Sequence, residues 1–197
     1  MSNNKKPIYN EELVEKLAAH IKSIIELLGE DPNREGLLKT PQRAAKALID
    51  NTSGYTTNAD QLIKQALFTH DGDDMVIVKD IEFYSLCEHH ILPFFGTISI
   101  GYIPDGEIVG LSKLARVVES QARRLQVQER LTTDICKIVS KNISNKGVIV
   151  LCEAAHMCMK MRGIEKQETT TVTIHHCGEF NKVEMQQKFF NLIQNKK

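Results

Sequence analysis

Two hydrophobic periodicities divide the chain into a helical first part and a mixed second part. Between residues 11 and 28, apolar residues recur at three- and four-residue spacings, which predicts an amphipathic helix that ends at Gly29. A polar connector follows and ends in Thr40-Pro41, which reads as an N-cap followed by proline at the first helical position. We therefore predict a second helix that continues to about Asp50.

From Met75 onward the period changes to two, as in a β-strand. Strands are predicted for the segment that begins there and for "FFGTISIGYIP", "GVIVLCEAAHMCMKMRG" and "ETTTVTIHH". Between the two strand pairs, "LSKLARVVESQARRLQ" and "ERLTTDICKIVSKNIS" have helical spacing, and a short helix ends the chain. This order predicts an α+β fold with an antiparallel sheet, in which residues 1–70 form a helical region and residues 71–197 the main domain.

Composition narrows the class of protein. The 197 residues suit one domain, or one domain with an appendage. Lys plus Arg equals Asp plus Glu at 25 each, which argues against nucleic acid as the main partner. We find neither an apolar run of about 18 residues nor a signal peptide's apolar stretch, so we expect no membrane partner. Five cysteines without an export signal favour reduced thiols in a cytoplasmic protein.

Two short clusters carry metal-ligand chemistry. In Cys87-x-x-His90 a thiol and an imidazole stand three residues apart, a spacing at which a turn brings both onto one cation. His156 and Cys158 lie two apart on a predicted strand, so they should project from one face, followed there by Lys160 and Arg162. The alternative interpretation is a solvated strand face with an incidental cysteine.

The number of protein ligands would decide what a zinc ion does here. Three ligands and an open position make a catalytic site, whereas four ligands make a structural one. The possible ligands are Cys87, one of His89 and His90, Cys158 and also His156. A set of two cysteines and one histidine leaves two histidines for proton transfer near neutral pH.

Basic side chains suggest an anionic ligand. Ser112 is placed where a helix should start, and Lys113 and Arg116 follow it. Such a helix start suits phosphate, although each cation alone is more simply a surface charge. Three further cations could belong to the same group: Arg43, Lys46 and Arg162. Glu129 follows Gln128 at the start of a predicted helix. Its carboxylate either interacts favourably with the helix dipole or accepts two N–H hydrogen bonds from a guanine edge, and the sequence alone does not choose between these roles.

Four separated blocks, "CEHH", "GLSKLARVV", "RRLQVQERLT" and "HMCMKMRG", resemble the diagnostic blocks of GTP cyclohydrolase I. The segment "REGLLKTPQRAAKAL" is similar to that family's N-terminal helical block, and the resemblance covers roughly residues 33–180. It implies a tunnelling fold: a four-stranded antiparallel sheet with helices on one face, whose subunits join into a toroid, usually a homodecamer. It also implies hydrolysis of GTP at C8, release of formate and ring closure to 7,8-dihydroneopterin triphosphate, which opens folate or tetrahydrobiopterin synthesis.

The resemblance implies a role for each site residue. Zinc would be held by Cys87, His90 and Cys158, while His156 would act as the acid and His89 would assist hydrolysis or the sugar rearrangement. Glu88 is expected to orient a neighbour or to face solvent. The nucleotide would be held by two groups, guanine by Glu129 and Gln128, and ribose and triphosphate by Ser112, Lys113, Arg116 and Arg162, with Arg43 and Lys46 contributing across a subunit boundary.

Departures from the family pattern keep alternatives open. His175, His176 and Cys177 do not fit it, and they either form a second metal site or, as we favour, occupy a strand end. A noncatalytic, zinc-stapled assembly module would use His156 as a fourth ligand. A related tunnelling-fold enzyme of pterin or deazapurine chemistry is the other alternative, and the pathway that the product feeds stays open.

Overall fold

The computed structural model describes residues 9–194, which form two compact units divided between Thr52 and Ser53. In the first unit, α1 (Glu11–Leu27) and α2 (Thr40–Asn51) pack through Val14, Ala18 and Ala45. The predicted first helix is confirmed. The N-cap of the second helix is Lys39 instead of Thr40, because the Thr40 hydroxyl bonds back to the Gly36 carbonyl and Thr40 is already helical.

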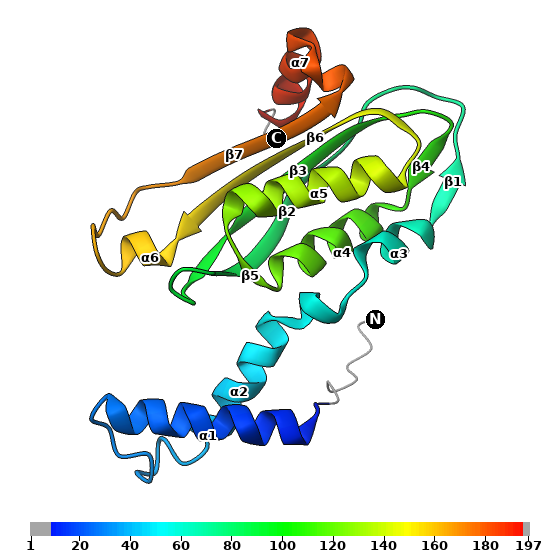
Figure 1. The fold of residues 1–197 in the computed structure, drawn as a ribbon. Coiled ribbons are helices and arrows are strands. Elements are labelled where there is room, and N and C mark those ends of the chain that lie inside the picture. The colour runs from blue at the N-terminus through cyan, green and yellow to red at the C-terminus, as the bar shows by residue number, and fades with distance from the viewer. Residues whose placement is uncertain (1–8, 195–197) are drawn as a thin grey trace. The chain divides into compact units, whose positions relative to one another are not determined.

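The second unit holds the remaining elements (Figure 1). In chain order they are η1 (Ser53–Thr56), α3 (Ala59–Lys64), β1 (Leu67–Thr69), β2 (Val76–Cys87), β3 (Pro93–Pro104), β4 (Glu107–Val109), α4 (Leu111–Ala122), β5 (Leu125–Gln126), α5 (Gln128–Asn142), β6 (Asn145–His156), α6 (Met157–Lys160), β7 (Thr171–Gly178), η2 (Glu179–Asn181) and α7 (Val183–Gln194). None of the helices in the described part of the chain is both long enough and apolar enough to cross a bilayer.

The main sheet has five strands in the order β5-β2-β3-β6-β7. The four long strands pair antiparallel, as predicted, and the α+β class is confirmed. The prediction of a purely antiparallel, four-stranded sheet is wrong in one detail, because the two-residue β5 adds a parallel partner to the end of β2 at Leu86 and Cys87. This short strand places the start of α5 beside Cys87. A separate two-stranded sheet joins β1 and β4.

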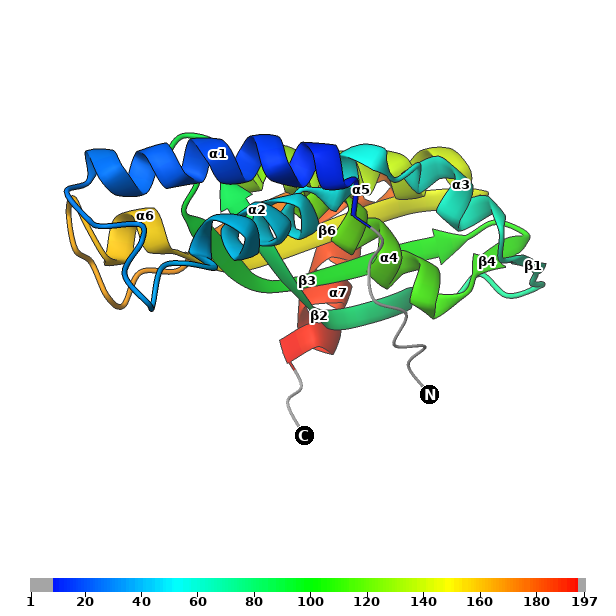
Figure 2. The same cartoon turned by 90° about the horizontal axis from the view of Figure 1, so that it is seen from below.

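Both faces of the sheet are covered along β6, because its apolar side chains alternate between the two faces. Val148, Val150 and Cys152 face one way and pack in a core with residues of α4 and α5. Ile149 and Leu151 face the other way and pack with Phe180 and Phe189, the latter from α7. Figures 1 and 2 show α7 across the sheet from α4 and α5. The prediction of helices on one face only is therefore wrong in this region. The apolar odd positions of β6 needed a second cover, and α7 provides it.

The strand predicted through "HMCMKMRG" stops earlier than expected. β6 ends at His156, and Met157–Lys160 form the short helix α6. His156 pairs with Phe94, and the next residue of β3 is Pro93, which has no N–H to continue the ladder. His156 and Cys158 therefore do not share a strand face, and our prediction of that face is wrong.

Candidate active site

Three side chains converge at the end of β2. The ligand atoms of Cys87, His90 and Cys158 all lie within 4.8 Å of one another. Cys87 is the last residue of β2, His90 follows in the turn, and Cys158 belongs to α6. Two thiolates and an imidazole are a donor set that zinc accepts, with ligand atoms about 3.8 Å apart around a tetrahedral ion. The three residues therefore fit a zinc ion.

The two adjacent histidines differ in their relation to Cys158. The Nδ1 atoms of His89 and His90 are each 3.9 Å from the Cys87 sulfur, so Cys87 alone does not distinguish them. Only His90 joins the group that includes Cys158, and its ring plane is turned 81° from that of His89. His89 instead lines a cavity next to the group.

The cysteines of this group differ in their surroundings from the cysteines of the core. Burial raises the pKa of Cys136 and of Cys152 to about 12, so both remain protonated thiols in the core. Burial also raises the pKa of Cys158, and the neighbouring Cys87 adds to the rise, while the Arg162 guanidinium opposes it. All five cysteines are free of disulfides.

A cavity of about 200 Å³ connects the metal-ligating group with the other predicted site residues. The lining includes Cys87, His89, Gln128, Glu129, His156 and Cys158. Residues from β2, β6, α5 and α6 thus line the same cavity, although they are far apart in the sequence. The cavity brings together two of the three predicted metal ligands, Cys87 and Cys158, with both predicted proton-transfer histidines and the predicted guanine-binding residues.

His156 is held on two sides. Its ring lies parallel to that of Phe94, with centroids 4.7 Å apart and an interplanar angle of 3°. Its Nε2 is 2.8 Å from the side-chain oxygen of Gln128. Burial lowers the pKa of His156, and the nearby Glu129 carboxylate partly opposes that shift. Sequence reasoning missed Phe94, which the β3–β6 register alone places opposite His156.

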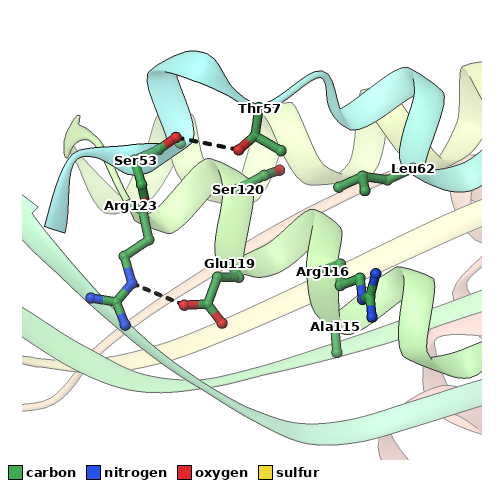
Figure 3. Close-up of a pocket in the computed structure, with 9 residues that line it drawn as sticks. Ser53, Thr57, Leu62, Ala115, Arg116, Glu119, Ser120 and Arg123 are labelled. Atoms are coloured by element: carbon green, nitrogen blue, oxygen red, sulfur yellow. Dashed lines mark hydrogen bonds and ion pairs between the residues drawn. The ribbon is translucent and has the colours of Figure 1, made fainter. Parts of the chain in front are cut away.

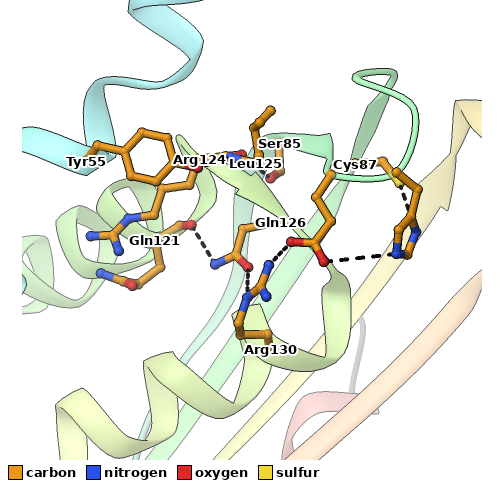
Figure 4. Close-up of polar contacts among 10 residues, drawn as sticks. Tyr55, Ser85, Cys87, Gln121, Arg124, Leu125, Gln126 and Arg130 are labelled. Atoms are coloured by element: carbon orange, nitrogen blue, oxygen red, sulfur yellow. Dashed lines mark hydrogen bonds and ion pairs between the residues drawn. The ribbon is translucent and has the colours of Figure 1, made fainter.

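A chain of polar contacts runs from Gln121 through Gln126 to Arg130 (Figure 4). Gln126 donates to the Gln121 carbonyl and accepts a 3.0 Å bond from Arg130 Nε. Arg130 also pairs with Glu88, whose other carboxylate oxygen is 4.0 Å from His89 Nε2. Glu88 is exposed and also contacts Arg130, which leaves open whether it orients a neighbour, and Arg130 is a residue that sequence reasoning missed.

The predicted phosphate-binding residues do not line the 200 Å³ cavity. Arg116 contributes to another cavity of about 390 Å³ with Ser53, Thr57 and Arg123, in which Arg123 pairs with Glu119 (Figure 3). Ser112 is exposed at the start of α4, and Lys113 donates to Gln65. Arg162 is exposed just after α6.

Two further predicted cations, Arg43 and Lys46, lie on α2 in the first unit, where Lys46 Nζ is 5.0 Å from the centre of the Tyr9 ring.

The residues that depart from the family pattern lie on β7. His176 is within hydrogen-bonding distance of Asn181 and Gln186, and the Cys177 thiol donates to Ser140. Within residues 9–194, the only group of three potential ligands that the structure brings together is the one around Cys87. The expectation that these residues occupy a strand end agrees with this placement.

Nearly the whole second unit and most of the first match one family model. The model, described as GTP cyclohydrolase I, matches residues 17–194. The chain belongs to the GTP cyclohydrolase I family. It is 52% identical over 186 residues to GTP cyclohydrolase 1 of Porphyromonas gingivalis, a match that covers 94% of this chain and 96% of the relative.

Family members from other kingdoms are equally similar. GTP cyclohydrolase 1 of Saccharomyces cerevisiae is 53% identical over 92% of this chain and 75% of the relative, and that of Dictyostelium discoideum 49% over 96% and 82%. Among solved structures, the apo archaeosine synthase QueF-Like gives a TM-score of 0.45 at 18% identity, over 55% of this chain and 97% of that one. That likeness is too weak to bear on fold or function, so the family assignment rests on sequence.

Proposed function

We propose that this protein is a zinc-dependent GTP cyclohydrolase I. It consumes GTP and one net water and produces formate and 7,8-dihydroneopterin triphosphate. The observation that carries the proposal is that two members of the Cys87, His90 and Cys158 group, the two cysteines, line one cavity with His89 and His156. Membership of the family, at about half identity over nearly the whole chain, names the substrate.

Cys87, His90 and Cys158 would hold the zinc ion, which supplies a Lewis acid that activates water for attack at C8 of GTP. The protein's own contribution is to place proton donors and acceptors around that carbon. His156 is fixed by Phe94 and Gln128 beside the ligands, which suits a group that delivers a proton to the guanine ring. His89 lines the same cavity and stays available for the later proton transfers.

Glu129 is our proposed anchor for guanine. It lies at the exposed start of α5, lines the cavity and is close enough to His156 to affect the pKa of that histidine. A carboxylate there can accept two N–H bonds from the guanine edge while C8 faces the metal ligands. Glu129 would thus hold the purine at one edge, while the ring is opened at C8 on the edge that faces the metal ligands.

The triphosphate site is proposed to form between subunits. Ser112, Lys113 and Arg116 do not line the cavity of Cys87 in the same chain, so a complete site needs these residues from another copy. Arg162 reaches the anion from the near side, since it is close enough to affect Cys158. Arg43 and Lys46 would add positive charge across a subunit boundary.

Assembly into a ring would also cover the open edges of the sheet. β7 is an edge strand in the described chain, and its Val172 and Ile174 are exposed. The opposite edge, β2, is paired only at its end by β5. Joining these edges in successive copies gives the toroid of a tunnelling fold, for which we propose a cytoplasmic homodecamer.

Incubation with GTP tests the proposal directly. The zinc-loaded protein should release formate and yield a product that becomes fluorescent neopterin after oxidation and dephosphorylation. Zinc that stays bound in a protein that produces neither compound would favour a noncatalytic, zinc-stapled module.

A further inference from the structure

The side-chain amide of Gln128 is buried and fully occupied by protein partners. Gln128 is 1% exposed. The two N–H groups of its Nε2 are shared among three acceptors, the carbonyl oxygens of Cys152 and Thr171, at 3.0 Å each, and the Thr173 hydroxyl at 3.2 Å. These acceptors belong to the two neighbouring strands β6 and β7. The amide therefore spans both strands from the start of α5.

The surrounding hydrogen bonds leave only one orientation for this amide. The Thr132 hydroxyl donates to the Gln128 main-chain carbonyl at 2.8 Å, so its single proton is used. Thr173, 2.6 Å away, must then be the donor to Thr132, which leaves its lone pairs for Gln128. A flipped amide would turn its oxygen against two carbonyl oxygens in a buried place. The oxygen of Gln128 consequently faces His156.

That orientation sets the tautomer of His156. An amide oxygen only accepts hydrogen bonds, so the Nε2 atom of His156, 2.8 Å away, must carry a proton. The proton that His156 delivers as an acid must therefore leave from Nδ1, the other ring nitrogen of the protonated imidazole. Among the residues that the structure describes, none is seen to hydrogen-bond the other ring nitrogen, Nδ1. The His156 ring stacks parallel to the Phe94 ring, so His156 cannot rotate away without losing this contact.

We propose that Gln128 is a positioning residue, whose buried amide orients His156 so that Nδ1 is the nitrogen presented to the nucleotide. This inference rests on the proposed function, because it deepens the part that His156 takes in it. It also gives the Gln128 side chain a different task from the guanine contact that the family resemblance implied, since such a contact would require the amide to give up a present partner.

The test uses Gln128→Met, which keeps the shape of the side chain and removes both polar atoms. In the zinc-loaded full-length enzyme, kcat for formate release should fall about 10- to 100-fold, because His156 is misplaced. KM for GTP should change less than about threefold and bound zinc should not change. Thr173→Val, which loosens the amide without touching its carbonyl partners, should lower kcat in the same way by a smaller factor, and it serves if Gln128→Met does not fold.

Two results would overturn the inference. One is a rise in KM at unchanged kcat, which would assign Gln128 to guanine binding. The other is an equal loss when Gln128→Met is added to His156→Ala, where a residue that acts only through His156 should have almost no further effect.

A crystal structure of Gln128→Met keeps the inference testable if the wild-type protein does not turn over GTP. We expect the His156 ring to leave its parallel position on Phe94. An unmoved ring would contradict the positioning role, whatever the activity.

Discussion

The imidazole rings of His89 and His90 stand 81° apart, with centroids separated by 6.2 Å, although the residues are adjacent. Both reach the sulfur of Cys87, but only His90 also meets Cys158. The turn after β2 therefore presents one ring to the group that could hold a metal ion and the other to the cavity. This geometry supports the assignment of different tasks to neighbouring and chemically identical side chains.

Substitution of each histidine should separate the two tasks. His90→Ala should lose zinc and activity together, because it removes one of three ligands. His89→Ala should keep zinc and lower kcat about 100-fold, as expected when one proton-transfer group is lost. Metal analysis and formate release on both variants decide the matter. Zinc loss in His89→Ala would exchange the two assignments.

The cysteine ligands can be tested against a matched cysteine outside the group. Cys158→Ser should lose zinc, since the hydroxyl is a poor replacement for a thiolate ligand. Cys177→Ser is the control, because Cys177 is also half-buried but lies on β7 away from the metal-ligating group. Equal zinc contents in the two variants would mean that Cys158 is not a ligand.

His156→Ala should retain zinc but lose the ring-opening step. Its Nε2 bonds to Gln128, so removal of the ring takes no ligand from the metal. Formate release should fall by about 10²- to 10⁴-fold, the usual contribution of a general acid. Release of the metal by this variant would instead support four protein ligands and a structural zinc site.

Substitutions at Glu88 and Arg130 compare the contribution of their ion pair to the free energy of unfolding with that of the hydrogen bond between Arg130 and Gln126. Glu88→Gln should lower the free energy of unfolding by less than about 1 kcal/mol, because the pair with Arg130 is substantially exposed. Arg130→Met should cost about 1–3 kcal/mol, because it leaves the oxygen of the 2% exposed Gln126 without its donor. Urea unfolding of both variants measures the difference, and equal losses would show that the ion pair dominates, because Arg130→Met removes that pair as well.

Gly96 lies where β3 and β6 approach too closely for any side chain. A Cβ atom there would be 1.9 Å from the Glu153 carbonyl oxygen, so Gly96→Ala must displace the ladder between these strands. We expect a loss of about 3 kcal/mol in the free energy of unfolding. Gly110→Ala, whose Cβ would find its nearest neighbour at 3.5 Å, should cost less than about 1 kcal/mol. Similar losses in the two variants would argue against the close approach.

The sequence predicted the strands well where one pattern controls them. Alternation located β2, β3 and β7, and the metal-ligating group around Cys87 follows from short spacings that a turn can close. The end of β6 was missed, because it depends on Pro93 in another strand, not on any residue near His156. The position of α7 was missed for a related reason, since only the folded sheet shows that Ile149 and Leu151 lack a cover.

The supports of the site were the hardest part to predict. Phe94 contacts His156 and Arg130 contacts Glu88 across long stretches of the chain, and no spacing in the sequence suggests either pair. The family resemblance named the residues that contact ligands, but it contained no information about what holds them in place. Register and packing supply that information.

Gln128 draws its anchors from β7 as well as from β6, and β7 is the edge strand of the sheet in this chain. Edge strands fray more readily than central ones. When β7 loosens at Thr171 and Thr173, the amide loses two of its acceptors and His156 loses its hold. A lone subunit would thus have a less ordered catalytic histidine than one whose edge is paired, so dilution below the assembly concentration should disorder His156 in addition to removing the phosphate-binding residues of the other copy.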